Sequence, residues 1–136
     1  AMTNTDNVAK KVILVVDDLA FDAEFTLQAL GKYDGRFEVD VARDGWDALV
    51  LMKDRHFDLI LMDLKMPRMD GFETMILMRG YQLQHDVPLI ILTNSDLDAD
   101  RDRARQLGAA DYVHKSADLA QYKAVLQATV EKHVRL

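Results

Sequence analysis

The sequence predicts an α/β fold in which five parallel strands form one doubly wound sheet with helices on both faces. Two observations lead to this prediction. Five short apolar segments alternate with segments of helical periodicity, and three of the five are apolar almost throughout. Strands covered on both faces have this continuous apolar character, and strand–helix alternation produces βαβ units. Right-handed crossovers then place helices on both faces of the sheet.

The predicted strands are distributed along the whole chain, at residues 12–16, 37–42, 57–62, 89–92 and 110–114. The first, third and fourth are the nearly continuous apolar segments, as expected for strands inside a parallel sheet. The second and fifth mix polar and apolar residues. We therefore expect these two at the edges of the sheet.

The predicted helices cover residues 20–32, 45–55, 72–83, 97–107 and 118–134. Gly108 follows the fourth helix and is typical of a left-handed C-terminal cap. Apolar residues recur at helical spacing, which predicts the buried faces. These faces are Phe21, Phe25 and Ala29; Ala48, Leu49 and Met52; Met75, Ile76 and Met78; and Leu119, Tyr122, Leu126 and Val130.

Length and composition favour one domain without membrane or disulfide elements. We expect a single domain over residues 8–136 and a disordered segment over residues 1–7, in which Ala1 before Met2 resembles a remnant of an expression tag. No cysteine is present, which excludes disulfide and thiolate chemistry. The apolar segments are too short to cross a bilayer, and residues 1–7 do not resemble a signal peptide. We therefore expect a soluble, cytoplasmic protein.

The net charge of −6 argues against nucleic-acid binding through the general surface. The last predicted helix ends close to the C-terminus, so we expect no DNA-binding or enzymatic output domain. A protein of this kind would act through contacts of its own surface with partner proteins.

Charged and hydroxyl side chains follow four of the predicted strands: Asp17 and Asp18, then Asp63, then Thr93, Asn94 and Ser95, and finally Lys115. In a doubly wound sheet these positions meet at the carboxyl edge, where ligands bind. Three carboxylates brought together repel one another unless a cation joins them, and oxygen ligands of this type suit Mg²⁺. Each residue alone is more often a turn or cap residue, so the coincidence of all of them is what favours a site.

The lysine and threonine suit a different ligand, a phosphoryl group. Phosphoryl transfer depends mainly on positioning and charge neutralisation, and a carboxylate can act as the nucleophile. The four histidines are scattered, at positions 56, 85, 114 and 133, without metal-ligand spacing. The sequence therefore predicts a magnesium-dependent phosphoryl site rather than a zinc site.

These motifs resemble the receiver domain of two-component response regulators, and the resemblance covers about residues 11–134. The matching segments are Val15-Val16-Asp17-Asp18, Leu61-Met62-Asp63-Leu64-Lys65-Met66-Pro67, Met69-Asp70-Gly71, Ile91-Leu92-Thr93 and Gly108-Ala109-Ala110-Asp111-Tyr112 leading to Lys115. The resemblance implies a flavodoxin-like strand order, 2-1-3-4-5. Residues 17–24 and 31–36 resemble the stand-alone regulators that partner bacterial phytochromes.

The resemblance also implies the role of each site residue. Asp63 accepts a phosphoryl group from a histidine kinase or a phosphotransfer protein. Asp18 and Asp63 bind Mg²⁺ directly, the backbone carbonyl of Lys65 is the third protein ligand, and Asp17 acts through a water molecule. Lys115 pairs with the phosphoryl oxygens. Such a protein is a phosphoacceptor in signalling, not an enzyme in the usual sense, although it catalyses its own phosphorylation and slow dephosphorylation.

Thr93 and Tyr112 would form a switch, with Thr93 binding the phosphoryl group and Tyr112 turning inward. The backbone N–H groups of Lys65 and Asn94 would complete the phosphoryl cradle. Lys65, Asn94 and Ser95 would modulate the lifetime of the phosphoryl group.

Three positions depart from the family pattern. Asn94 stands where a very small residue is usual and could crowd or shield the phosphoryl group. Ser116 stands where proline usually follows the lysine, so we expect a trans Lys115–Ser116 peptide bond. Lys65 places a cation beside Asp63, where it could pair with this carboxylate or with the phosphoryl group.

A homodimer through the fourth helix, fifth strand and fifth helix is a further expectation. Val125, Ala128 and Leu136 fall off the predicted buried face of the last helix, and the fourth helix is rich in Asp and Arg, as reciprocal ion pairs across a two-fold axis require. The alternative to a dimer interface is that these apolar residues are ordinary scattered surface residues.

The leading alternative is a pseudo-receiver, a binding module with the same fold that is not regulated by phosphorylation. A dehalogenase-type phosphatase would need an aspartate at Lys65. A flavodoxin or dinucleotide-binding module would need a phosphate-binding loop where Asp17 and Asp18 stand.

Overall fold

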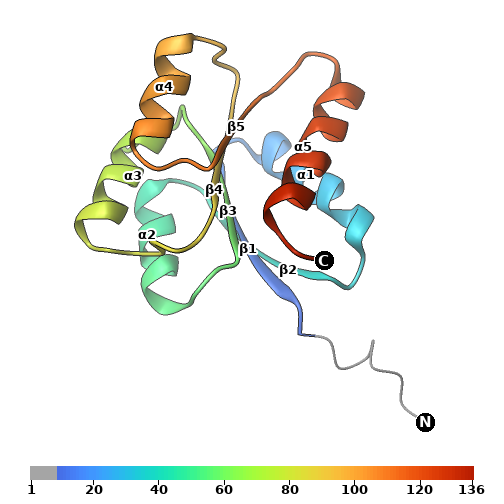
Figure 1. Cartoon of the computed structure of the whole chain (residues 1–136), viewed down its shortest axis with the longest axis horizontal. Helices are drawn as coiled ribbons and strands as arrows, with labels where there is room; N and C mark the ends of the chain where they lie inside the picture. The colour runs from blue at the N-terminus through green and yellow to red at the C-terminus, as the bar shows by residue number, and fades with distance from the viewer. Residues whose placement is uncertain (1–8) are drawn as a thin grey trace.

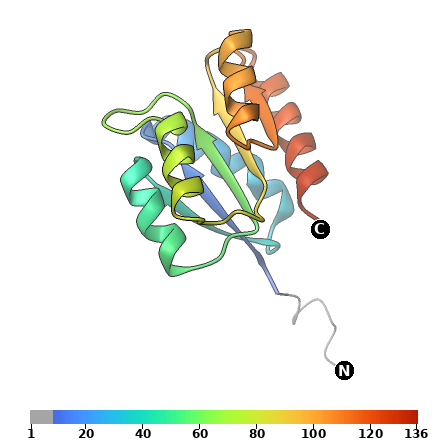
Figure 2. The ribbon, with the colours of Figure 1, turned by 60° about the vertical axis from the view of Figure 1, so that its left-hand side comes forward.

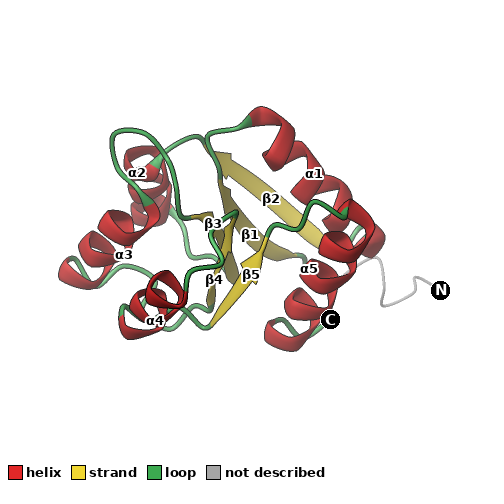
Figure 3. Cartoon of the chain, turned by 90° about the horizontal axis from the view of Figure 1, so that it is seen from above, coloured by secondary structure: helices red, strands yellow, loops and turns green. Residues whose placement is uncertain are grey.

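The computed structural model describes residues 9–136 and shows three layers, a parallel sheet between two groups of helices (Figure 1). The strand order is β2-β1-β3-β4-β5, as predicted. Helices α1 and α5 cover one face of the sheet, and α2, α3 and α4 cover the other (Figure 3). The expected disorder of residues 1–7 lies outside the described residues.

The strands are β1 (Lys11–Val16), β2 (Phe37–Ala42), β3 (Leu59–Asp63), β4 (Leu89–Thr93) and β5 (Asp111–His114). The helices are α1 (Ala20–Leu30), the 3-10 helix η2 (Gly31–Tyr33), α2 (Gly45–Asp54), α3 (Gly71–Gly80), α4 (Asp98–Gln106) and α5 (Leu119–His133). None of the helices in residues 9–136 has the length and apolar character needed to cross a membrane.

The sheet is buried most completely at its centre. Every residue of β3 and β4 is buried, whereas the edge strands β2 and β5 include partly exposed residues, as predicted. Alternate side chains of each central strand enter opposite cores. Leu14, Ile60 and Ile91 pack under α2–α4, and Ile13, Leu61 and Leu92 pack under α1 and α5. These two cores fix the positions of the strand ends that carry the polar residues.

Strand β3 begins two residues later than predicted. Phe57 is fully buried but precedes the strand, and its N–H donates to the side-chain oxygen of Gln84 at 3.0 Å. Asp58 makes a two-way contact with Val12: the N–H of Asp58 donates to the Val12 carbonyl, and the Asp58 carboxylate accepts from the Val12 N–H, both at 2.7 Å. Continuous apolar character therefore extended the predicted strand beyond the hydrogen-bonded ladder.

The predicted buried face is correct for α2 but wrong at one position in each of α1, α3 and α5. Phe21 is 71% exposed, Ile76 is 46% exposed and Leu119 is 48% exposed. Phe21 and Leu119 lie in the first turn of their helices, where the chain has just left the carboxyl edge of the sheet. Helical spacing fixes which residues share a stripe, but only the position of the helix over the sheet decides how far the stripe is covered.

Two local features bring α3 close to the end of β3. Asp70 caps the helix by accepting from the N–H of Glu73 at 2.8 Å, and the Glu73 side chain returns to the Asp70 N–H, a capping box. A Cβ atom on Gly71 would lie 2.7 Å from the backbone oxygen of Asp63. Glycine is therefore needed where the helix begins against the strand end.

Two backbone predictions are confirmed. Gly108 follows α4 with φ +106°, the left-handed conformation expected of a C-terminal cap. Every peptide bond in residues 9–136 is trans, including the one between Lys115 and Ser116. Helices α4 and α5 then flank the edge strand β5 on its two sides (Figure 2).

Candidate functional site

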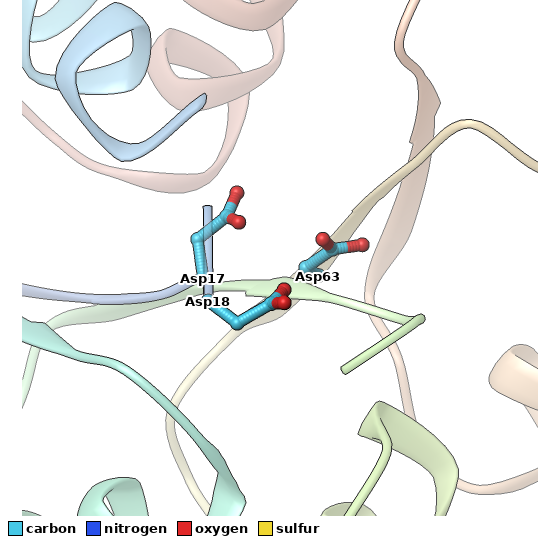
Figure 4. Close-up of side chains that lie close together, drawn as sticks. All are labelled: Asp17, Asp18 and Asp63. Atoms are coloured by element: carbon cyan, nitrogen blue, oxygen red, sulfur yellow. The ribbon is translucent and has the colours of Figure 1, made fainter. Parts of the chain in front are cut away.

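Three carboxylates converge at the carboxyl edge of β1 and β3. Val16 of β1 pairs with Met62 of β3. The residues that come next in sequence, Asp17 and Asp63, are therefore neighbours. Oxygen atoms of Asp17, Asp18 and Asp63 lie within 4.8 Å of one another. Figure 4 shows the three side chains rising from the two strand ends. The structure thus brings together the acids that the sequence placed at separate strand ends.

The ammonium group of Lys115 is buried against these acids. Its Nζ donates to Asp17 Oδ2 at 3.0 Å, to Asp63 Oδ2 at 3.3 Å and to Asp22 Oδ2 at 2.9 Å. The Lys115 side chain is only 7% exposed. Burial alone lowers the pKa of Lys115, but the carboxylates of Asp63, Asp22 and Asp17 outweigh it and raise this pKa above its ordinary value. Lys115 is therefore a permanent cation at this site.

Asp22 contacts Lys115 at this site, and the sequence analysis did not select it. It lies in the first turn of α1, four residues after Asp18. Because α1 begins directly after the acidic pair, an acid in its first turn stays close to the carboxyl edge of the sheet. That spacing was the available signal, and it is a weak one, because acids are common in the first turn of any helix.

Asp63 is held in a partly desolvated position. Its Oδ1 accepts from the backbone N–H of Lys65 at 3.2 Å, and its Oδ2 faces Lys115. Burial raises the pKa of Asp63 to about 6; the charge of Lys115 works against this rise and the charge of Asp17 adds to it. Burial likewise raises the pKa of Asp17, although Lys115 lowers it. The single ammonium group of Lys115 therefore does not neutralise the negative charge of these carboxylates.

The donor set fits a divalent cation. Asp18 Oδ1 is buried and has no hydrogen-bond partner among the described residues, a costly arrangement unless something else satisfies it. Four carboxylates, counting Asp22, face one ammonium group at this edge. Hard oxygen ligands of this type suit Mg²⁺, which binds proteins through one or two carboxylates and keeps several waters.

Thr93 and Tyr112 are linked through Ser95. Thr93 is fully buried, and its hydroxyl oxygen accepts from the N–H of Ser95 at 3.2 Å. The Tyr112 hydroxyl donates to the backbone oxygen of Ser95 at 2.9 Å, and the guanidinium of Arg101 lies over the Tyr112 ring at 4.5 Å from its centroid. Tyr112 therefore lies inward, beneath the loop between β4 and α4.

Comparison with known proteins agrees with this geometry. Residues 13–127 match the response regulator receiver domain. The chain belongs to that family. Over 130 residues this receiver domain is 29% identical to a probable cyclic di-GMP phosphodiesterase of Vibrio cholerae, covering 96% of the chain but only 28% of that relative. The chain thus spans little more than a quarter of the relative's length.

Solved structures of response regulators are similar over nearly their whole length. The phosphorylated cyanobacterial phytochrome response regulator RcpA has a TM-score of 0.85 at 27% identity, covering 93% of this chain and 96% of that one. The Mn²⁺-bound form of the response regulator Rcp1 has a TM-score of 0.80 at 25% identity, with the same coverage. Chemotaxis protein CheY4 of Vibrio cholerae has a TM-score of 0.80 at 25% identity, covering 93% and 100%.

The receiver domain holds Lys65 away from Asp63. Among the described residues, the ammonium of Lys65 forms its only ion pair with Asp100 of α4, at 3.8 Å, and its side chain is 64% exposed. Asp100 also accepts from the hydroxyl of Ser95 at 2.6 Å. Only the backbone N–H of Lys65 contacts Asp63, so the structure brings the Lys65 main chain, but not its side chain, to the acidic site.

A groove of about 430 Å³ opens beside Lys115, between α1 and the connection from β5 to α5. Asn94 lines this groove and is exposed, and its backbone oxygen lies 3.0 Å from His114 Nε2. Apolar side chains of Phe21 and Leu119 also line it and are largely exposed. Asp22 and Lys115 of the acidic site are therefore part of the wall of this groove.

Proposed function

We propose that this receiver domain accepts a phosphoryl group from the phosphohistidine of a histidine kinase or phosphotransfer protein onto Asp63, in a reaction that requires Mg²⁺. The observation that supports this most directly is the position of Asp63. Its carboxylate lies between a buried ammonium and an acidic pair whose Asp18 Oδ1 has no partner in the described chain. A cation and a phosphoryl group together would satisfy these charges.

Asp18 and Asp63 would bind Mg²⁺ directly, with the backbone carbonyl of Lys65 as a third ligand and Asp17 acting through water. When bound, Mg²⁺ would neutralise charge on the phosphoryl oxygens. Mn²⁺ in the similar regulator Rcp1 supports a divalent cation. Calorimetric titration with Mg²⁺ is the direct test, and Asp18→Asn should weaken binding strongly while Asp98→Asn, on exposed α4, should not.

Asp63, Lys115 and Thr93 would each have a separate role in the transfer. An oxygen of Asp63 forms the new P–O bond as the P–N bond to the donor histidine breaks. Lys115 neutralises the phosphoryl oxygens through its ammonium group. The Thr93 hydroxyl binds a phosphoryl oxygen and gives up its contact with the Ser95 N–H, which would pass the change to Tyr112 through the Ser95 carbonyl.

A protein donor would dock over the groove beside Lys115. Leu19, Phe21 and Leu119 surround it with exposed apolar surface, 50%, 71% and 48% exposed respectively. Such a cluster is a common mark of a binding surface. The likeness to the cyanobacterial phytochrome response regulator RcpA supports a kinase of the phytochrome type as that donor.

We further propose a homodimer through α4, β5 and α5. Val125 and Leu136 are 44% and 46% exposed, and Ala128 is exposed. Tyr112 lies on the same edge, so phosphorylation would alter the contact. Light scattering of the bare and phosphorylated protein tests this, and a monomer in both states at high micromolar concentration would exclude it.

The decisive experiment is phosphorylation by small donors. Incubation with phosphoramidate and Mg²⁺ should label wild type at Asp63, as mapped by mass spectrometry, and Asp63→Asn should remain unlabelled. Full labelling of Asp63→Asn at another residue would contradict the assignment. Absence of labelling in the wild type with normal folding would favour the pseudo-receiver, a binding module without phosphorylation.

A further inference from the structure

Lys115 has three carboxylate partners, and Asp22 is the one outside the acidic cluster of β1 and β3. It is also the nearest, at 2.9 Å, against 3.0 Å for Asp17 and 3.3 Å for Asp63. An ammonium group has three N–H donors. All three donors of Lys115 are therefore engaged by carboxylates in this structure.

Asp22 differs from the other two partners in its surroundings. Its side chain is 24% exposed, whereas those of Asp17 and Asp63 are 3% and 7% exposed. It lines the groove of about 430 Å³ through which Lys115 is reached. Asp22 thus places a negative charge in the wall of the groove that Lys115 also lines, and its contact is the one that solvent can most easily replace.

Helix electrostatics alone explain an acid in the first turn of α1, because the helix dipole favours negative charge there. They do not explain why the carboxylate is turned to Lys115 from the neighbouring end of the sheet. The ion pair spans 93 residues of sequence and joins α1 to the residue that follows β5. The contact is a tertiary one, directed at the cation that would neutralise a phosphoryl group.

We propose that Asp22 is a positioning residue that restrains Lys115 in the resting state and so disfavours free, highly charged phosphodonors. The inference rests on the proposed phosphorylation of Asp63. A phosphoryl oxygen can reach Lys115 only when one of its three N–H contacts is released. The charge of Asp22 opposes the incoming anion at the same time.

A docked protein donor can offset the free-energy cost of releasing Lys115, whereas a small donor cannot. A protein that covers Phe21 and Leu119 gains binding free energy remote from the reacting atoms, which offsets the cost of releasing Lys115. Acetyl phosphate has no such contacts. With acetyl phosphate, an oxygen of Asp63 forms a P–O bond, the P–O bond to the acetyl group breaks, and acetate leaves; with phosphoramidate, the P–N bond breaks and ammonia leaves.

The test compares wild type with Asp22→Asn, which keeps an oxygen acceptor for Lys115 but removes the charge. Initial labelling rates are measured by intact-mass spectrometry at saturating Mg²⁺ with each donor. Asp22→Asn should be labelled about tenfold faster by acetyl phosphate, the order expected when one like charge is removed near an anion site. The gain with phosphoramidate should be smaller, because this donor carries less negative charge at neutral pH.

Two variants serve as controls. Asp22→Glu keeps the charge and should remain close to wild type. Glu24→Gln removes the same charge from an exposed position two residues along α1 and should leave both rates unchanged. Asp22→Ser, which also removes the charge, replaces the amide variant if thermal unfolding shows that Asp22→Asn does not fold.

The outcomes separate this inference from the proposed function. If neither donor labels wild type at Asp63, the proposed phosphorylation fails. If wild type is labelled and Asp22→Asn reacts at the same rate or more slowly, only the restraint by Asp22 is overturned. An equal gain with both donors would also overturn it, because a change in packing, unlike a change in charge, does not discriminate between the two anions.

Discussion

Two lysines contact Asp63, Lys115 through its ammonium group and Lys65 through its backbone N–H alone, and the surroundings of the two ammonium groups differ sharply. The Lys115 side chain is 7% exposed and contacts three carboxylates at 2.9–3.3 Å. The Lys65 side chain is 64% exposed and contacts one carboxylate, Asp100, at 3.8 Å. The same residue type therefore forms a buried ion cluster on one side and a surface ion pair on the other.

The difference shows that burial, rather than proximity to the acceptor, decides what each cation contributes. A charge removed from water must be compensated, and deleting one partner of a buried ion pair leaves the other uncompensated. A surface pair is hydrated and screened, so its deletion costs little. We therefore expect Lys115 to influence both stability and chemistry, and Lys65 to influence chemistry alone.

The largest effect is expected for Lys115→Met. The change leaves Asp17, Asp22 and Asp63 without their shared cation, so the free energy of unfolding without divalent ions should fall by about 3–5 kcal/mol at pH 8. Phosphorylation of Asp63 should be lost or greatly slowed. Urea unfolding in EDTA measures the first effect, and labelling with phosphoramidate measures the second.

Mg²⁺ provides the control for this experiment, because a divalent cation can compensate the same carboxylates. Added Mg²⁺ should stabilise Lys115→Met more than it stabilises wild type. Equal unfolding free energies of wild type and variant in EDTA would show that the buried ion cluster does not contribute to stability as expected.

A smaller effect of opposite sign is expected for Asp63→Asn, which removes an acid from the Lys115 cluster and leaves the Lys65 pair intact. Burial raises the pKa of Asp63 to about 6 from an ordinary value of 3.8. The folded protein therefore holds this proton more tightly than the unfolded chain, and wild-type stability falls as pH rises from about 4 to about 6. Above that window the full penalty remains, so Asp63→Asn should be more stable by about 3 kcal/mol without metal.

The pH dependence is the check on this sign. Thermal or urea unfolding in EDTA should show the two proteins converging as the pH falls below the ordinary value of 3.8, where Asp63 becomes protonated in both folded and unfolded wild type. A difference that is constant from pH 4 to pH 8 would mean that the carboxylate charge is not its cause.

The smallest change in stability is expected for Lys65→Met. Loss of the exposed pair with Asp100 should alter the free energy of unfolding by no more than about 0.5 kcal/mol. The rate of dephosphorylation should nevertheless change in Lys65→Met and in Asn94→Ala, because the Lys65 main chain contacts Asp63 and a phosphoryl group there could draw the exposed Lys65 ammonium from Asp100, while Asn94 follows Thr93 at the same edge of the sheet. Decay of labelled protein after removal of the donor measures this rate, and unchanged decay in both variants would contradict a modulating role.

The fold was predictable because its signals are local. Continuous apolar character identified β1, β3 and β4 as inner strands, and mixed character identified β2 and β5 as edge strands, in agreement with the observed order. The errors in the predicted buried faces arise because helical spacing is a local signal that does not report how far a helix extends beyond the sheet. Helical spacing assigned Phe21 and Leu119 to buried stripes, yet both are exposed because they lie in first turns beyond the sheet.

The acidic site was predictable to the extent that it follows strand ends. Asp17, Asp18 and Lys115 follow strands and Asp63 ends one, so the parallel sheet places all four at its carboxyl edge. Asp22 and Asp100 lie on helices, and no spacing rule says which way their carboxylates turn. Their contacts with Lys115 and Lys65 depend on how α1 and α4 pack on the sheet.

The sequence by itself determined which strands lie inside the sheet, the residues at the carboxyl edge and their chemical type, because these follow from apolar periodicity and from the positions of the strand ends in a parallel sheet. The full strand order came from the resemblance to receiver domains. The tertiary structure decided which charges are buried and which cation each acid holds. These choices depend on distances across elements far apart in the chain, such as the 93 residues between Asp22 and Lys115. The interaction energy of two charges rises steeply when they are buried. Lys115 and Lys65 therefore differ in their contribution only once the chain has folded.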